Sequence, residues 1–424
     1  MRYLTSRNFH YLLLTCIALF FGAVLRRIEL VLIAVPFVSA VLLSALLDWR
    51  PWYKMTYAIS RDRLFEGDTL SVTITVEALS ALPFLELVDP ISDSVDLISG
   101  SNRIMTHLKK GETQEIRYDL LCIRRGRYRA GGLFVRAYNF SQMVAHAEHL
   151  NELREYIVFP KMSPIHRPFA PNHTQVYVGN YVSRAVGEGI EFGNIRTYSS
   201  GDTIKRVNWR TSARMGNLYV NEYFLERNAD LVLLLDTLSN IGNKYLNTLD
   251  ICARGVASIA QHYLHNKDRV GLIDYGATFR WQRPEMGVAQ FYKILNKLID
   301  SETRFSYVSR DVAEIPRRIL PPQAMIIALT PLVDERIIKA LTNLAARQFD
   351  LAVIVVPPHE VMREIEKGSR IVEAACRFWG LQIGIQINEL RKLGLTVVEW
   401  SLKKPLDLVM YEVKQSKRRA KLNL

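Results

Sequence analysis

Two uncharged apolar stretches near the start of the chain are the clearest feature of its hydrophobic pattern. Residues 9–25 and residues 30–47 contain no Asp, Glu, Lys or Arg, and only residues 26–29 separate them. Each stretch is close to the roughly 20 residues that a bilayer-spanning helix needs. A cleaved signal peptide needs a small-residue cleavage site, and a soluble core helix carries a polar stripe, but neither feature is present. We therefore expect residues 1–54 to form a transmembrane hairpin with helices at about 9–25 and 30–47.

The charges around this predicted hairpin indicate its orientation. Arg26 and Arg27 occupy the turn, whereas basic residues are more frequent beyond the outer ends. These are Arg2, Arg7, Arg50, Lys54, Arg61 and Arg63. Since basic flanks stay on the cytoplasmic side, we expect a two-pass cell-membrane protein with its C-terminal domains in the cytoplasm. Four cysteines, far apart along the chain, agree with a reducing compartment.

Residues 55–160 alternate between apolar and polar positions. Residues 69–77 (TLSVTITVE) are the clearest case, and similar alternation recurs at 115–121 and 128–138. Short alternating strands separated by glycine-containing turns predict an antiparallel β-sandwich. The next segment, residues 161–228, is rich in Arg, Gly and aromatic residues without any long apolar period, and we expect an ordered connector packed on its neighbours.

Residues 229–407 alternate between apolar strands and amphipathic helices. Residues 231–235 (LVLLL) form a fully apolar strand that ends at Asp236, and residues 246–265 have a helical period. Further strands and helices follow in alternation, which predicts a doubly wound, Rossmann-type α/β domain with a parallel sheet. Residues 408–424 form a basic tail. Its last residues, 414–424, hold five basic residues and no acidic one, and we expect them to be solvated or to lie on anionic lipid.

The most specific stretch of the sequence is residues 184–214, RAVGEGIEFGNIRTYSSGDTIKRVNWRTSAR. It resembles the motif of the "domain of unknown function 58" family of prokaryotic proteins, G-x-G-x-E-F…R-x-Y…G-D…I-x-W-x-x-S-A-R. The residues that carry this motif, with Arg184 before it, are Arg184, Gly187, Gly189, Glu191, Phe192, Arg196, Tyr198, Gly201, Asp202, Asn208, Trp209, Ser212, Ala213 and Arg214. Upstream, residues 124–128 (RRGRY) and the following glycine pair also resemble the family.

This resemblance has three implications. The C-terminal half is expected to be similar to a von Willebrand factor A domain, in agreement with the α/β pattern. The resemblance implies a MoxR-type AAA ATPase as the partner, because family members are often encoded beside one. No enzymatic activity accompanies the resemblance, which implies a membrane-anchored adaptor.

A metal site has to be judged from the residues themselves. A von Willebrand A fold holds Mg²⁺ through D-x-S-x-S after its first strand, and hard oxygen ligands suit that ion. Here the loop has Asp236, but Leu238 replaces the first serine, Asn240 replaces the second, and Ser239 falls between them. Leu238 cannot be a ligand, so we expect no metal or other cofactor and predict that Asp236 caps a helix or accepts hydrogen bonds from its own loop.

The arginines of the motif admit three interpretations. Arg196, Arg206, Arg210 and Arg214 can pair with nearby carboxylates and fix one domain to another, or they can form a partner surface together with aromatic residues. A catalytic role is the least supported, because no nucleophile stands beside a base. The overall charge of +13 is not a nucleic-acid signal, since no nucleic-acid module is present.

We therefore predict a membrane-anchored, non-enzymatic adaptor that contacts the lipid bilayer and a MoxR-type AAA ATPase during assembly or maturation of a protein complex. One alternative is a divalent-metal-dependent binding or hydrolytic protein that uses Asp236. Another is an outward-facing receptor or adhesin. The sequence assigns no oligomeric state.

Overall fold

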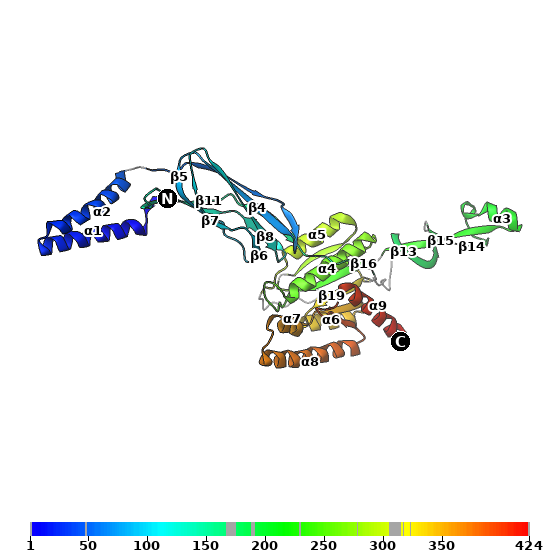
Figure 1. The fold of residues 1–424 in the computed structure, drawn as a ribbon. Coiled ribbons are helices and arrows are strands. Elements are labelled where there is room, and N and C mark those ends of the chain that lie inside the picture. Colours follow the sequence, from blue (N-terminus) through cyan, green and yellow to red (C-terminus); the bar gives the residue numbers. More distant parts are fainter. Residues whose placement is uncertain are drawn as a thin grey trace. The chain divides into compact units, whose positions relative to one another are not determined.

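The computed structural model describes most of the chain, in two compact units, Met1–Phe159 and Pro160–Leu424 (Figure 1). The described residues are 2–46, 49–166, 175–187, 191–228, 230–277, 279–304, 315–316, 318–322 and 324–422. Each unit has its own helices and strands and its own hydrophobic core. The predicted multidomain organisation, with apolar N-terminal helices followed by β and α/β parts, is confirmed.

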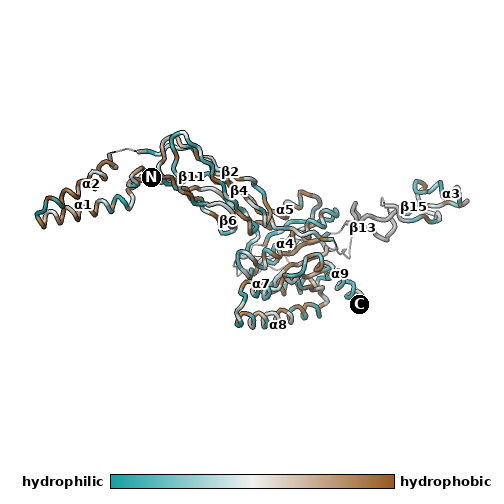
Figure 2. The backbone as a smooth tube through the Cα atoms, in the orientation of Figure 1, coloured by the Kyte–Doolittle hydropathy of each residue, from teal (hydrophilic) through white to brown (hydrophobic). Residues whose placement is uncertain are grey.

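The first unit begins with a short strand and two apolar helices, β1 (Arg2–Leu4), α1 (Ser6–Leu25) and α2 (Ile28–Leu46). Arg26 ends α1 in a left-handed conformation, with φ at 49°. The two helices contact each other, and a Cβ atom on Gly22 would lie 2.7 Å from Val31 Cγ2. Apolar residues dominate both helices (Figure 2). By length and composition, α1 can cross a membrane, and α2 contributes a shorter apolar segment, Ile28–Ser44.

The rest of this unit consists of strands in three sheets. The strands are β2 (Tyr53–Ile59), β3 (Arg63–Phe65), β4 (Thr69–Ala78), β5 (Leu82–Val88), β6 (Val95–Ser99), β7 (Arg103–Leu108), β8 (Thr113–Cys122), β9 (Gly126–Ala130), β10 (Leu133–Tyr138), β11 (Val144–Leu150) and β12 (Arg154–Phe159). Their orders are β1-β11-β10-β5-β7, β2-β4-β8-β6 and β3-β12-β9. Every second residue of β4 from Leu70 to Ala78 is buried in one core, as the alternation predicted. One pair differs from the antiparallel prediction, since β3 and β12 are parallel.

The second unit opens with a three-stranded sheet where the sequence predicted a connector. Its elements are β13 (Gln175–Gly187), β14 (Glu191–Thr197), β15 (Tyr219–Asn228), the short helix η1 (Ile204–Arg206) and α3 (Trp209–Met215). The strand order is β13-β15-β14, all antiparallel. The sequence analysis expected an ordered connector here and did not predict its strands. The pairing of β13 with β15 shifts register twice, and such irregularities break the two-residue period that identifies a strand.

The α/β domain has a six-stranded sheet with the order β18-β17-β16-β19-β20-β21. Its strands are β16 (Asp230–Asp236), β17 (Arg269–Tyr275), β18 (Arg280–Glu285), β19 (Met325–Thr330), β20 (Asp350–Val355) and β21 (Thr396–Glu399). All neighbours are parallel except β17 and β18. The wholly parallel prediction therefore fails at this edge, because the link from β17 to β18 is too short for the crossover that a parallel strand needs.

Helices cover both faces of this sheet. They are α4 (Thr248–His265), α5 (Gly287–Ile299), α6 (Glu335–Ala346), α7 (Pro358–Ile365), α8 (Arg370–Lys392) and α9 (Leu406–Leu422). Val232 and Leu234 of β16 pack in one core with residues of α6 and α8. Strand geometry directs their neighbours to the opposite face, where α4 contacts β16.

The predicted solvated tail forms α9 and is part of the folded domain. Val409, Met410 and Val413 are fully buried, and Lys417 Nζ lies 2.5 Å from Asp350 Oδ1, with each of these two side chains 9% exposed. The prediction of a solvated tail fails at the buried Lys417, because it weighed the basic residues of this segment and missed the apolar residues at helical spacing before them.

Two helical glycines provide a test of packing in this domain. A Cβ atom on Gly255 of α4 would lie 2.6 Å from Leu329 Cδ2 and 2.7 Å from Trp400 Cζ3, whereas one on Gly384 of α8 would meet open space. Replacing glycine by alanine favours a helix by about 0.5–1 kcal/mol, but overpacking costs about 1–3 kcal/mol. We expect Gly255→Ala to lower the thermal unfolding midpoint and Gly384→Ala to maintain or raise it. Equal midpoints for the two variants would contradict this packing.

Candidate functional site

The family-like motif occupies the three-stranded sheet and the turns that follow it. Gly189 lies outside the described residues. Only the backbone is described for Arg184 and Gly187 in β13 and for Glu191 and Phe192 in β14. The motif residues from Arg196 onward have described side chains, and the geometry of the site is built from these.

Arg196 joins three segments of this region. Its guanidinium donates from Nη1 and Nη2 to both carboxylate oxygens of Asp202, at 2.7 and 2.6 Å, and from Nε to Glu222 Oε1 at 2.7 Å. The Ser199 amide also donates to Asp202, at 2.8 Å. The guanidinium and this amide hold the pKa of Asp202 below its usual range. A bidentate pair fixes geometry as well as charge, so Arg196 holds the 198–203 turn against β14 and β15.

A second set of polar contacts fixes α3 onto β15. Asn208 caps the helix by accepting from the Thr211 amide and donates to Asn221 Oδ1 at 2.9 Å. Ser212 Oγ accepts from the Tyr219 amide at 2.9 Å. Gly216 ends the helix at a φ of 73°, a conformation that favours glycine. These motif residues are structural, and they determine which side chains α3 exposes.

The residues left exposed form what we call the tip surface. Ile204 is 67% exposed, Trp209 63% and Met215 60%. Between them stand the exposed cations Lys205, Arg210 and Arg214. Among the described side chains, no carboxylate pairs with Arg210 or Arg214. Large exposed apolar groups with unpaired arginines have the composition of a protein-binding hot spot, and the described residues of this surface contain no nucleophile beside a base.

Asp236 occupies the carboxyl end of β16, where ligands of α/β sheets usually bind. Its side chain is 1% exposed. Oδ2 accepts from the Thr330 hydroxyl at 2.6 Å and Oδ1 from the Leu238 amide at 2.9 Å. Burial raises the pKa of Asp236 to about 7, and these two hydrogen bonds oppose that increase. The carboxyl group therefore connects β16 to β19 and holds its own loop, a role that the sequence predicted in part.

Most of the oxygen atoms in and near the loop after β16 that could bind Mg²⁺ already take part in contacts within the protein. Both carboxylate oxygens of Asp236 are engaged as described. Asn240 Oδ1 accepts from the Leu249 amide at 3.2 Å, at the start of α4. Asp334 pairs with Arg336 at 2.7 Å and caps α6. Ser239 Oγ, which is buried without a partner among the described residues, is the remaining oxygen of the degenerate loop.

A different group of side chains contains metal-ligand types that sequence spacing could not bring together. His359 and Glu360 of α7 and Glu399 at the end of β21 each offer an atom within 4.8 Å of the others. Ligands on one zinc ion lie closer, at about 3.3 Å. Glu360 Oε2 already accepts from Ser401 Oγ and the Leu402 amide. This set therefore connects α7 to the segment after β21. The sequence analysis missed Glu399, since only strand order places it beside α7.

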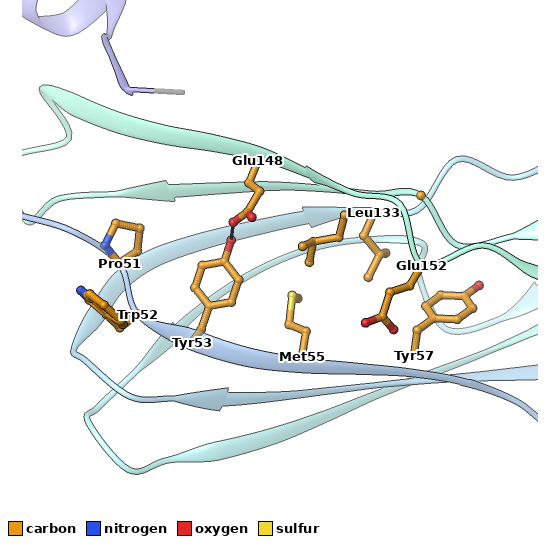
Figure 3. Close-up of a pocket in the computed structure, with 10 residues that line it drawn as sticks. Pro51, Trp52, Tyr53, Met55, Tyr57, Leu133, Glu148 and Glu152 are labelled. Carbon is orange, nitrogen blue, oxygen red and sulfur yellow. Dashed lines mark hydrogen bonds between the residues drawn. The ribbon is translucent and has the colours of Figure 1, made fainter.

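Each unit contains a pocket whose lining includes polar side chains. A cleft of about 700 Å³ in the second unit has Arg254, Glu360 and Trp400 among its lining residues. A smaller one of about 210 Å³ lies in the first unit. There the Tyr53 hydroxyl donates to Glu148 Oε2 at 2.7 Å, and the two side chains point toward each other (Figure 3). Burial raises the pKa of Tyr53, and the carboxylate adds to this increase. The small pocket thus contains a structural contact between sheets.

Comparison with known proteins places the described site in a family. The model described as "Protein of unknown function DUF58" matches residues 194–392. The chain is 22% identical over 248 residues to the "Uncharacterized protein YeaD" of Bacillus subtilis, over 57% of this chain and 60% of that protein. It thus spans about three fifths of the curated relative that it matches.

Similarity to solved structures is weaker. A CARDB domain from Pyrococcus furiosus, solved with di-metal ions, is 13% identical with a TM-score of 0.18, over 26% of this chain and 88% of that one. A β-glucosidase from Listeria innocua is 15% identical with a TM-score of 0.16, over 26% of this chain and 16% of that one. TM-scores this low support no conclusion about fold or function.

The buried carboxyl group of Asp236 predicts a pH dependence of stability. Its ordinary pKa is 3.8 and its folded-state pKa is about 7, so the folded state holds the proton over that window. The free energy of unfolding then falls as pH rises, by up to about 1.4 kcal/mol for each pH unit. Asp236→Asn mimics the protonated form. We expect its thermal midpoint to fall less between pH 5 and pH 8 than that of the wild type.

Asp334→Asn is the matched control. Its hydrogen bonds with Arg336 lower the pKa of Asp334, so the stability that it contributes is present above its ordinary pKa and is lost only in stronger acid. We expect this variant to shift the midpoint equally at pH 5 and pH 8. An unchanged pH dependence in Asp236→Asn would contradict the assignment.

Proposed function

Because the chain belongs to the DUF58 family through residues 194–392, we propose that it is a membrane-anchored adaptor that binds a protein partner and has no enzymatic activity of its own. The single observation that supports this proposal most is the tip surface. It exposes Trp209 together with Ile204 and Met215, and a hydrogen-bonded frame around Arg196 and Ser212 holds it. Trp and Arg are the residue types that contribute most to protein interfaces.

The charge of the tip surface determines the chemistry of the partner. Lys205, Arg210 and Arg214 are exposed, whereas the carboxylates of Asp202 and Glu222 are held by Arg196. These residues therefore combine positive charge with exposed apolar side chains, and a complementary partner presents acidic groups beside an apolar recess. We propose that a MoxR-type AAA ATPase supplies this recess, as the family resemblance implies, and that the adaptor acts in assembly or maturation of a protein complex.

We assign the α/β domain a von Willebrand A-like, metal-independent role in this adaptor. The strand order with β18 as an antiparallel edge strand supports that fold. The engagement of Asp236 by Thr330 and Leu238 supports independence from metal, because the first ligand of the loop is already used within the protein.

The apolar helices α1 and α2 are the proposed anchor. The length and hydropathy of α1 support this proposal. The basic residues outside the two helices favour a cytoplasmic location for the domains that follow.

Partner capture tests the tip surface. The full-length protein, cross-linked and purified from native membranes, is expected to retain an AAA ATPase identified by mass spectrometry. Since a central Trp contributes about 2 kcal/mol or more, we expect Trp209→Ala to reduce retention of the ATPase at least about tenfold. Arg210→Glu is expected to reduce retention as well. Lys339→Glu, an equal charge change at an exposed position of α6, is expected to retain the partner.

Two results would count against this function. One is a wild-type preparation without any AAA ATPase. The other is equal loss of the ATPase in Trp209→Ala and Lys339→Glu, which would show that binding does not depend on the tip surface.

Protease access tests the proposed orientation. Protease added to intact cells should leave residues 55–424 uncut, and the same protease added after the membrane is opened should degrade them. Cleavage in intact cells would support the outward-facing receptor instead.

A further inference from the structure

Helix α8 (Arg370–Lys392) carries apolar residues on two opposite faces. One face packs into the core of the α/β domain through Cys376, Ile383, Ile387 and Leu390, all buried. The other face is exposed. A surface helix of a globular protein normally has one apolar face and one polar face, so the second apolar face requires an explanation of its own.

The exposed face consists of a regular stripe of side chains, which we call the α8 stripe. Four of its residues are large and apolar, with exposed fractions of 82% for Ile371, 73% for Phe378, 70% for Leu381 and 59% for Ile385. Ala374 and Asn388, both exposed, continue the same row. Within the part of the chain that the structure describes, no side chain buries these residues. Contiguous apolar surface of this kind usually indicates a binding interface.

The spacing of the α8 stripe is that of a coiled coil. Residues 371, 374, 378, 381, 385 and 388 follow each other at alternating intervals of three and four, which is the a and d pattern of a heptad repeat. Ile371, Phe378 and Ile385 occupy a positions, and Ala374, Leu381 and Asn388 occupy d positions. The buried residues Cys376, Ile383 and Leu390 fall at f positions, directly opposite the seam. The helix can therefore pair with a second helix without leaving its own core.

We propose that the α8 stripe binds the same stripe of a second copy of this chain, in a parallel two-helix seam. Isoleucine at a positions and leucine at a d position favour a parallel pair of helices. Asn388 places one polar residue at a d position of the seam. Gly384, where an added Cβ atom would meet nothing, and Ala375 flank the seam with small residues and allow the helices to approach closely.

The charges beside the seam select the parallel arrangement. One edge, the g positions, carries Arg370, Arg377 and Arg391, and the other edge, the e positions, carries Ala375, Gln382 and Glu389. Parallel helices bring each g edge against the partner's e edge, so that Arg377 faces a glutamine. Antiparallel helices bring the two g edges together, with arginine against arginine. Like charges across a seam disfavour that arrangement.

The size of the paired surface is sufficient for a specific contact. Both copies bury an aromatic ring and three large aliphatic side chains, which brings the interface to about 1,000 Å², the lower end for specific interfaces. The contact uses residues of α8 alone and is independent of the tip surface, so it adds self-association to the proposed adaptor function.

The test uses the full-length protein in detergent or in lipid nanodiscs. We expect the wild type to have the mass of a dimer and Leu381→Asp to be a monomer, with dimerisation at least tenfold weaker. Lys339→Asp is the control, and it should remain dimeric. A circular dichroism spectrum of Leu381→Asp equal to that of the wild type would show that the exposed substitution leaves the fold intact, whereas its thermal midpoint can fall because the dimer contact is lost.

Cysteine cross-linking tests the register. With Cys16 replaced by serine, Leu381→Cys is expected to form a disulfide-linked dimer on oxidation, because parallel d positions face their own copies. Lys339→Cys should not. A monomeric wild type, a dimer that Leu381→Asp leaves intact, or equal cross-linking of the two cysteine variants would overturn the proposal. So would quenching of Phe378→Trp fluorescence by brominated lipid, since the stripe would then lie in the bilayer.

Discussion

The bidentate pairing of Arg196 with Asp202, completed by Glu222, is the interaction on which the functional interpretation depends. The surrounding sheet has irregular pairing between β13 and β15 and a short helix, α3, that has only two turns of its own. Such a helix is not stable in isolation. A planar guanidinium that holds a turn and two strands at once, together with the Asn208 and Ser212 contacts, gives this region a defined surface. The polar residues of the motif thus form the frame, and the residues that they leave exposed are the ones available to a partner.

In the α/β domain, a buried carboxyl group makes structural contacts at the carboxyl end of a parallel strand, where α/β sheets usually bind ligands. Asp236 accepts from Thr330 on the neighbouring strand, and Thr237 donates to Asp274, which in turn accepts from Arg280. These contacts join β16, β17, β18 and β19 at one edge of the sheet. These hydrogen bonds fix the loops at the carboxyl ends of the strands to one another.

Periodicity along the chain predicted the parts of the fold whose residues follow one rule. The fully apolar β16 is buried along its whole length, because a strand covered on both faces needs apolar residues at every position. The alternating β4 buries every second residue, because only one of its faces packs on the core. In α9, the basic residues led to the prediction of a solvated tail, although an apolar row that includes Val409 and Val413 was present at helical spacing. Pairing of Arg196 with nearby carboxylates was one of the predicted options, whereas the proximity of Glu399 to His359 depends on strand order, which local spacing does not encode.

Site-specific photo-cross-linking from position 209 in native membranes measures what the tip surface contacts. A photoreactive amino acid at Trp209 of the full-length protein is expected to yield a cross-link to an AAA ATPase, and the same group at Lys339 is expected to yield none. The absence of the ATPase from the products at position 209, or its equal recovery from both positions, would contradict the proposal that the tip surface is the site of partner binding.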